Sequence, residues 1–186
     1  MIQPGLFRRV VPPGTRQLNK VAKVCAVAGV TPFLLMGFLG VRINASPSLP
    51  LGIYSITDNA DAPLIEFCPA EPYGSFAAIR GYRSEGSCSD GATPFLKPVV
   101  ARGGDIVSIS AKGIAVNGNL IPHSAPLEED TQHRPMTPWP FGRYEVANGT
   151  VWVASSYNDR SFDSRYFGPV AISSIRNHLR PLVTFP

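Results

Sequence analysis

Two short segments carry residues whose types and spacing could do chemistry together. Residues 46–54 read Ser-Pro-Ser-Leu-Pro-Leu-Gly-Ile-Tyr and offer serine hydroxyls in a turn constrained by proline and glycine. Residues 95–105 offer a single lysine, Lys97, in an apolar stretch. A serine becomes a nucleophile when a base takes its proton, and a lysine shielded from water can be that base. The two segments therefore predict a hydrolytic Ser/Lys dyad.

Lys97 is the candidate base because apolar residues surround it. An ordinary lysine has a pKa near 10.4 and is protonated at neutral pH, whereas burial lowers the pKa by several units. The other residues of 95–100 are apolar, and the nearest acidic residues along the chain are Asp90 and Asp105. The local sequence leaves another interpretation equally open, in which Lys97 points outward on an edge strand and discourages aggregation.

The serine segment and the histidines leave alternatives as well. Clusters of Ser, Pro and Gly mark turns in general, so residues 46–52 could also be a linker. A histidine oriented by an aspartate is the more familiar base for a serine. His123 and His133 lie in a Pro-rich polar segment, and neither they nor His178 has a supporting motif. Lysine is therefore favoured over histidine.

A third segment, residues 155–168, is dense in hydrogen-bonding groups and follows the strand-like residues 151–154. One interpretation is a salt-bridged surface turn. The other is a support that holds the lysine, because a dyad needs a group that orients its base. The charged residues that could pair locally are Asp159, Arg160, Asp163 and Arg165.

The elements that position these residues begin with an apolar run. Residues 24–41 contain no charge over 18 positions, just enough for a membrane-spanning helix, and only basic charges precede them. Because basic residues stay on the cytoplasmic side, we expect a cytoplasmic tail over 1–23, a transmembrane helix over 24–41 and an exported domain over 42–186. The location would be the bacterial inner membrane, with the exported domain in the periplasm. A cleaved secretory signal is the alternative.

Charge and cysteines agree with export. The net charge is +4, but residues 1–42 hold six of the 17 basic residues, which leaves 11 basic against 13 acidic residues in the remainder. The net positive charge thus comes from the basic residues that flank the predicted membrane helix, and it gives no support for nucleic-acid binding. Cys68 and Cys88 can pair in an oxidising compartment, which would stabilise the domain by roughly 3 kcal/mol. The alternative, a two-cysteine metal site, lacks nearby ligands, so we expect no metal.

The exported part is expected to be β-rich, because its segments are short and separated by glycine and proline. Asn117-Gly118 and Asn148-Gly149 both signal hairpins. One short helix is expected within 170–182, and a surface loop over 123–140. The strand-like segments are 53–57, 105–110, 113–121 and 146–154.

Together the apolar run and the three segments resemble the type I signal peptidase family, and most closely its TraF branch, the peptidases of plasmid conjugal transfer. In that family a Ser-x-Ser box, a lysine box ending in Asp and a Ser-x-Asp-Ser-Arg box follow a membrane anchor. The TraF branch adds an Asn-x-Ser-x-Ser-x-Pro-x-Gly-x-Tyr-like start, matched by residues 44–54, and a Phe-Cys-Pro segment, matched by 67–69. Its second cysteine, before the lysine box, is matched by Cys88.

The resemblance implies a role for each matched residue. Ser48 falls on the nucleophile and Lys97 on the general base. Ser46 falls on a serine that helps bind the oxyanion, Ser161 on a serine that hydrogen-bonds the lysine, and Asp163 and Arg165 on a structural ion pair. The chain departs from the family pattern around the dyad at Pro98, at Gly103-Gly104 and at 155–158, where Ser-Ser-Tyr-Asn replaces Gly-Asp-Asn-Arg.

The resemblance also implies a fold and a function. The fold is a mainly β, signal-peptidase-like domain of coiled sheets behind one transmembrane helix. The activity is cleavage of exported precursors after small residues, without a metal or organic cofactor. A pilin precursor, the membrane and other transfer-system proteins are the implied partners, and an acyl-enzyme would end in hydrolysis or in a cyclic pilin. The competing hypotheses are a non-catalytic membrane-anchored assembly factor of the transfer apparatus and a general signal peptidase.

Overall fold

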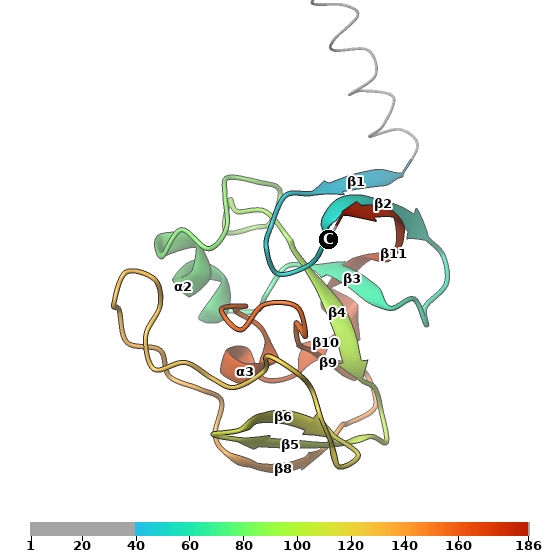
Figure 1. Cartoon of the computed structure of the whole chain (residues 1–186). Coiled ribbons are helices and arrows are strands. Elements are labelled where there is room, and N and C mark those ends of the chain that lie inside the picture. Colours follow the sequence, from blue (N-terminus) through green and yellow to red (C-terminus); the bar gives the residue numbers. More distant parts are fainter. Residues whose placement is uncertain (1–39, 186) are drawn as a thin grey trace, which may run out of the picture. The chain divides into compact units, whose positions relative to one another are not determined.

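The computed structural model describes residues 40–185, and within that range the chain is mainly β (Figure 1). The expectation of a mainly β domain is confirmed. The helical segments are α2 Tyr73–Ile79, α3 Ser164–Phe167 and the 3-10 turn η1 Ile172–Ser174. The strands of the described residues are β1 Val41–Asn44, β2 Leu51–Thr57, β3 Leu64–Phe67, β4 Phe95–Ala101, β5 Ile106–Ser110, β6 Gly113–Val116, β7 Asn119–Leu120, β8 Gly142–Glu145, β9 Thr150–Val153, β10 Val170–Ala171 and β11 Ile175–Phe185.

The expected cytoplasmic tail over 1–23, and nearly all of the expected membrane helix over 24–41, lie outside the described residues. Only Gly40, which lies in a turn, and Val41, the first residue of β1, are described. Among the described helices, none is long and apolar enough to cross a membrane. The anchor therefore stays a prediction from the sequence.

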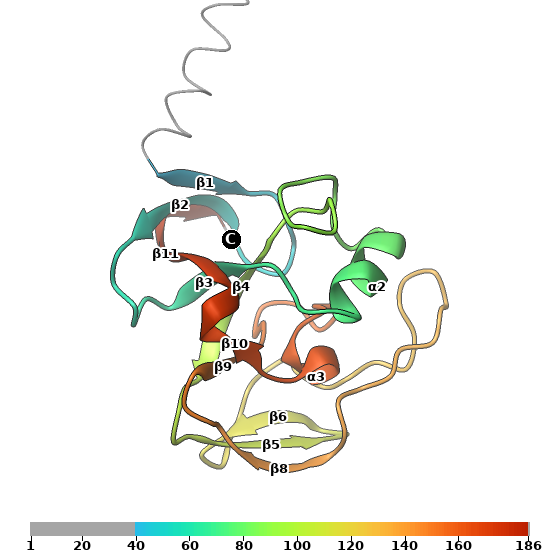
Figure 2. The ribbon, with the colours of Figure 1, turned by 180° about the vertical axis from the view of Figure 1, so that it is seen from behind.

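Two antiparallel sheets make up the described domain. The larger has seven strands in the order β1-β2-β11-β3-β4-β9-β10, and the smaller has the order β7-β6-β5-β8. Both views of the ribbon place the smaller sheet at the end of the domain away from β1 (Figures 1 and 2). The chain passes from the larger sheet to the smaller after β4 and returns through β9, so β4 and β9 connect the two sheets.

The hairpin predicted at Asn117-Gly118 is confirmed. These two residues connect β6 to β7, with Val116 paired to Asn119. Asn117 and Gly118 have φ angles of 50° and 86°, the positive values that a two-residue hairpin turn of this kind requires. Local turn chemistry was therefore enough to predict the pairing.

The hairpin predicted at Asn148-Gly149 is wrong. The two residues form a turn, but it connects β8, which pairs with β5, to β9, which pairs with β4 and β10. The three residues Val151, Trp152 and Val153 of β9 are all buried, so both faces of this strand are covered. The reason for the difference is tertiary: β9 finds its partners in the other sheet and not in the preceding segment.

The short helix expected within 170–182 is confirmed only as the single 3-10 turn of η1, because strands β10 and β11 occupy the rest of this segment. Strand β11 pairs with β2 on one side and β3 on the other, so neighbouring strands satisfy its backbone groups. Pro181 lies next to a register shift in β11, where a missing N–H is tolerated. In a helix interior the same proline would remove a hydrogen bond.

The expected loop over 123–140 contains no helix or strand, and it folds back onto the domain. The backbone N–H of Leu127 donates to the hydroxyl of Tyr166 at 2.9 Å. Asp130 accepts from the hydroxyl of Tyr82 at 2.6 Å and from Nε of Arg134 at 2.7 Å. The contacts with Tyr166 and Tyr82 hold the loop against α3 and against the segment that follows α2.

Cys68 and Cys88 form a disulfide. The bond joins the end of β3 to the segment before β4 and closes a loop that contains α2. The predicted pairing is confirmed, and the alternative of a two-cysteine metal site is wrong. The buried Arg83, within this loop, forms an ion pair with Asp90, which lies just beyond Cys88. This pair lies beside an aromatic core formed by Phe67, Phe95, Phe162, Tyr166 and Phe167.

Candidate active site

Residues 45–50 form an ordered turn between β1 and β2, so the linker interpretation is wrong. The buried Asn44 organises this turn: its Oδ1 accepts from the N–H of Ser46 at 3.1 Å, and its Nδ2 contacts three carbonyl oxygens of the turn. The hydroxyl of Tyr54 donates to the carbonyl of Pro50 at 2.6 Å. The turn thereby holds Ser48 at the surface of the domain with its backbone fixed.

Gly52 lets this turn lead directly into the sheet. A side chain at Gly52 would collide with the backbone of Val183 in β11, which runs beside it. Its φ of 156° is also a value that residues with side chains rarely adopt. The glycine in the first segment is therefore required by the close approach of two strands.

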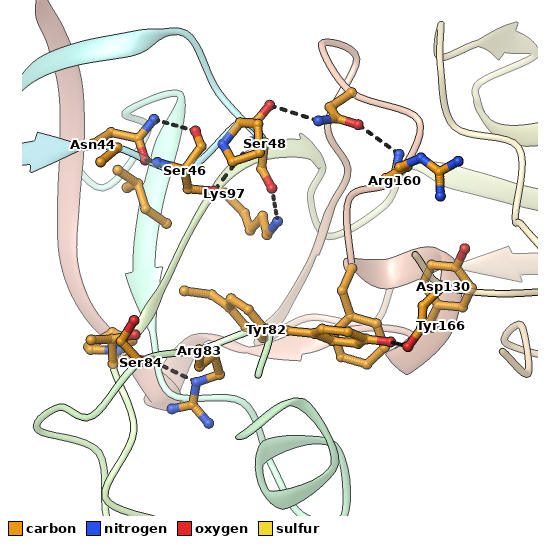
Figure 3. Close-up of a pocket in the computed structure, with 18 of the residues that line it drawn as sticks. Asn44, Ser46, Ser48, Tyr82, Arg83, Ser84, Lys97, Asp130, Arg160 and Tyr166 are labelled. Atoms are coloured by element: carbon orange, nitrogen blue, oxygen red, sulfur yellow. Dashed lines mark hydrogen bonds between the residues drawn. The ribbon is translucent and has the colours of Figure 1, made fainter. Parts of the chain in front are cut away.

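Lys97 lies in β4 opposite Ile65 of β3, and only 3% of its surface is exposed. The interpretation in which its side chain points outward is therefore wrong. Its Nζ lies 2.9 Å from Oγ of Ser48 and 2.8 Å from Oγ of Ser161. Figure 3 shows the side chains of Ser48 and Lys97 pointing toward each other. The ring centroid of Phe95 lies 5.4 Å from the same nitrogen.

Burial lowers the pKa of Lys97 from 10.5 to about 8, because the charged ammonium loses its hydration. The carboxylate of Asp163 opposes this shift, and the guanidinium of Arg165 adds to it. At neutral pH a usable fraction of the amine is therefore uncharged. A neutral amine 2.9 Å from a serine hydroxyl can accept its proton.

Asp163 and Arg165 form a buried ion pair rather than a surface salt bridge. Both side chains are fully buried, and Nε of Arg165 lies 2.8 Å from Oδ1 of Asp163. The remaining donors of Arg165 reach backbone carbonyls of Ala125, Ser155 and Asp159. The interpretation as a salt-bridged surface turn is wrong for these two residues, and the pair holds residues 155–165 in one shape.

Ser46 and Ser161 flank the pair of Ser48 and Lys97. Oγ of Ser46 accepts from the backbone N–H of Ser48 at 3.3 Å, so the Ser46 hydroxyl lies beside the N–H of the residue expected to react. Ser161 is buried and contacts Lys97 from the other side. The structure thus brings together the four serine and lysine residues that the sequence singled out.

Two residues near Ser48 were missed by the sequence analysis. The hydroxyl of Ser155 donates to the carbonyl of Ser48 at 2.6 Å, and Nδ2 of Asn158 donates to the carbonyl of Pro47 at 3.2 Å. The only available signal was that residues 155–158 depart from the family pattern. Their partners lie more than 100 residues away along the chain, so no local pattern could reveal the contacts.

A groove of about 720 Å³ adjoins Ser48 and Lys97. Figure 3 shows Tyr82 and Arg83 on the side opposite Ser48. None of the residues that line this groove is a histidine, and no group of His, Cys, Asp or Glu that could hold a metal gathers among residues 40–185. The groove is lined by strand, turn and loop residues that include Arg42, Asn44, Glu66, Tyr82, Leu127, Asp130 and Met136.

Comparison with known proteins decides the family. A model of the family described as signal peptidase, peptidase S26, matches residues 17–183. The chain belongs to this family. The resemblance inferred from the sequence is therefore confirmed, and the S26 signature extends over nearly the whole domain described above.

Relatives of the chain carry names from plasmid transfer. The chain is 35% identical over 178 residues to the plasmid transfer protein TraF of Escherichia coli, covering 92% of this chain and 99% of that protein. It is 32% identical over 166 residues to the conjugal transfer protein TraF of Agrobacterium fabrum, covering 86% of this chain and 90% of that protein. A signal peptidase I from Enterococcus faecalis aligns in structure with a TM-score of 0.36 and 18% identity, over 68% of this chain and 100% of that chain.

Proposed function

We propose that this protein is a serine endopeptidase that uses Ser48 as nucleophile and Lys97 as general base. The observation that carries the proposal is the contact of 2.9 Å between Nζ of Lys97 and Oγ of Ser48, made by a lysine that is buried and has a pKa of about 8. Membership of the peptidase S26 family supports the same chemistry.

The reaction begins with proton transfer. The uncharged amine of Lys97 takes the proton of the Ser48 hydroxyl while Oγ attacks the carbonyl carbon of the scissile peptide bond. Oγ of Ser161 accepts a hydrogen bond from the amine of Lys97, so the lone pair of that nitrogen is free to face Ser48. The ammonium then returns the proton to the leaving amine, and an ester to Ser48 remains as the acyl-enzyme.

The oxyanion forms beside the backbone N–H of Ser48. In the structure this N–H contacts Oγ of Ser46, so the oxygen of the substrate takes that place and the Ser46 hydroxyl turns to donate to it. Donors placed in advance around developing charge are among the largest contributions to catalysis, and the loss of one typically costs about 10²–10³ in rate.

The substrate binds as an extended strand in the groove. Within the described residues β9 pairs with β4 at Val99 and Ala101, and residues 95–97 line the groove beyond the end of β9. Their backbone can add a substrate strand, as peptides commonly do at a sheet edge. A small residue before the scissile bond places the carbonyl carbon next to Ser48.

The names of the relatives support a proposal for the substrate class. Relatives aligned over nearly their whole length are named for plasmid or conjugal transfer. We therefore propose that the enzyme acts in conjugation on an exported precursor, most simply a pilin precursor. Residues 24–41 would anchor it in the inner membrane with the domain in the periplasm, alongside other transfer-system proteins. The acyl-enzyme is resolved by water or by the amino terminus of the same substrate.

The test is cleavage of a co-expressed pilin precursor in membranes by the wild type, Ser48→Ala and Lys97→Ala. We expect the wild type to shorten the precursor and both variants to leave it intact. Ser156→Ala is the matched control, because Ser156 is exposed and does not line the groove. The mass of the product separates hydrolysis from cyclisation, since the cyclic product is lighter by one water.

Each contrary outcome points to a named alternative. Processing at the wild-type rate by Ser48→Ala or Lys97→Ala would refute the dyad. A wild type that processes no exported precursor would favour the non-catalytic assembly factor. Cleavage of many unrelated precursors at similar rates would favour a general signal peptidase.

A further inference from the structure

One loop holds the backbone carbonyl groups of both Pro47 and Ser48, the two that flank the Cα atom of Ser48. Asn158 contacts the carbonyl of Pro47, and Ser155 contacts the carbonyl of Ser48. We infer that Ser155 and Asn158 act as a clamp that aims the backbone N–H of Ser48 at the oxyanion, and that both are positioning residues. The inference rests on the proposed peptidase function.

Asn158 acts through the planarity of the peptide bond. In a trans peptide the carbonyl of Pro47 and the N–H of Ser48 belong to one rigid plane and point in opposite directions. Nδ2 of Asn158 holds that carbonyl at 3.2 Å and therefore fixes the direction of the N–H. This N–H is the group that faces the developing negative charge in the proposed mechanism.

Ser155 fixes the peptide plane that follows Ser48, to which the Ser48 carbonyl belongs. Its hydroxyl donates to the carbonyl of Ser48 at 2.6 Å and accepts from the N–H groups of Tyr157 and Asn158 at 3.1 Å each. The rotation of the Ser155 hydroxyl is thereby determined, because its donor and acceptor sites are all engaged. With both planes held, the Ser48 side chain and its N–H keep one relative orientation.

The clamp is attached to the buried ion pair of Asp163 and Arg165. The N–H of Ser155 donates to Oδ2 of Asp163 at 3.0 Å, and the carbonyl of Ser155 accepts from Arg165 at 3.3 Å. Ser155 is itself fully buried. The buried ion pair thus supports two functions: it orders the segment that carries Ser161 toward Lys97, and it anchors the clamp on the nucleophile turn.

The test compares Asn158→Ala, Ser155→Ala and the matched control Ser156→Ala in the full-length enzyme. Ser155 is buried and its hydroxyl bonds to Ser48, Tyr157 and Asn158, whereas the adjacent Ser156 is exposed. The substrate is a peptide that spans the cleavage site of the pilin precursor. We expect kcat to fall by about ten- to hundredfold in the first two variants, with KM and the pH at the midpoint of the rate profile unchanged.

A transition-state analogue distinguishes a misdirected Ser48 N–H from a general loss of substrate binding. Ser48 adds to a peptide aldehyde to form a hemiacetal whose oxygen lies where the oxyanion forms. The same peptide with a reduced CH2–NH bond forms no such oxygen. The aldehyde should bind Asn158→Ala more weakly by the factor lost in kcat, and the reduced peptide should bind as it binds the wild type.

The outcomes are distinct from those of the proposed function. If the wild type does not cleave, the peptidase proposal fails. If it cleaves and Asn158→Ala keeps the wild-type kcat, only the clamp is refuted. An equal loss of affinity for the aldehyde and the reduced peptide would also refute it. Asn158 is only half-buried, so Asn158→Ala decides the matter even if Ser155→Ala fails to fold.

Discussion

Lys97 exchanges the hydration of an ammonium group for contacts with two serine hydroxyls and an aromatic ring. That exchange sets the pH range in which the amine can act. With a pKa of about 8, roughly a tenth of the amine is uncharged at pH 7 and most of it is uncharged at pH 9. The pH dependence of the rate therefore tests the identity of the base.

We predict that kcat/KM rises about tenfold between about pH 7 and pH 9 and then levels off, because only the uncharged amine accepts a proton. The measurement is initial cleavage rate against pH with the peptide substrate. Ser156→Ala should give the same profile. A profile that levels off below about pH 7 would point to a carboxylate or a histidine as the base.

The amine of Lys97 also makes the free energy of unfolding depend on pH. The folded-state pKa of about 8 lies below the ordinary value of 10.5, so the unfolded chain binds more protons between these pH values and stability rises with pH. Lys97→Met removes this titration. We expect the stability of wild type relative to Lys97→Met to increase by roughly 3 kcal/mol from pH 8 to pH 10.5, measured by urea unfolding. Parallel curves for the two proteins would contradict the lowered pKa.

The residues of the site differ in how far a sequence predicts them. Ser48, Lys97 and Ser161 could be named because their types and order follow a family pattern, and the structure places them within hydrogen-bond distance. Their roles stay predictions. Asn158 and Ser155 could not be named, because each acts on a backbone carbonyl that only the folded chain brings near.

At the level of elements, the disulfide-closed loop supplies residues of the groove but neither residue of the proposed dyad. Tyr82, Arg83 and Ser84 line the groove and lie between Cys68 and Cys88, whereas Ser48 and Lys97 lie outside this loop. The bond closes a loop with a sequence separation of 20 residues. A closed loop of this size restricts the unfolded chain and stabilises the folded domain.

We predict that the double variant Cys68→Ser, Cys88→Ser loses about 3 kcal/mol of the free energy of unfolding. Its KM should rise more than its kcat falls, because the groove wall loosens while the dyad is kept. Denaturant unfolding and peptide kinetics measure the two effects. A reducing agent should destabilise the wild type and leave the double variant unchanged; equal sensitivity of both would speak against a stabilising bond.

Pairings between neighbouring segments were predictable, and pairings with distant segments were not. Asn117-Gly118 forms the expected hairpin because the two strands it joins pair with each other. Asn148-Gly149 has the same turn chemistry, yet its flanking strands belong to different sheets. Residues 175–185 became a strand because β2 and β3 lie on both sides of them, which no window of the sequence contains.

Across the whole described domain, the site is assembled from segments far apart in the chain. Ser48 and Lys97 are 49 residues apart, Lys97 and Ser161 are 64 apart, and Ser48 and Ser155 are 107 apart. Each segment comes from a different element: the turn after β1, strand β4 and the loop after β9. The contacts among them therefore depend on the packing of the larger sheet.

Strand β11 lies between β2 and β3, although it is the last of these strands to be synthesised. Until residues 175–185 have been synthesised, β2 and β3 lack the strand that lies between them. The turn that carries Ser48 leads into β2, and Lys97 lies in β4, which pairs with β3, so we expect the proposed dyad to form only once β11 is in place. A peptidase built in this way would be inactive while its own chain is still being made.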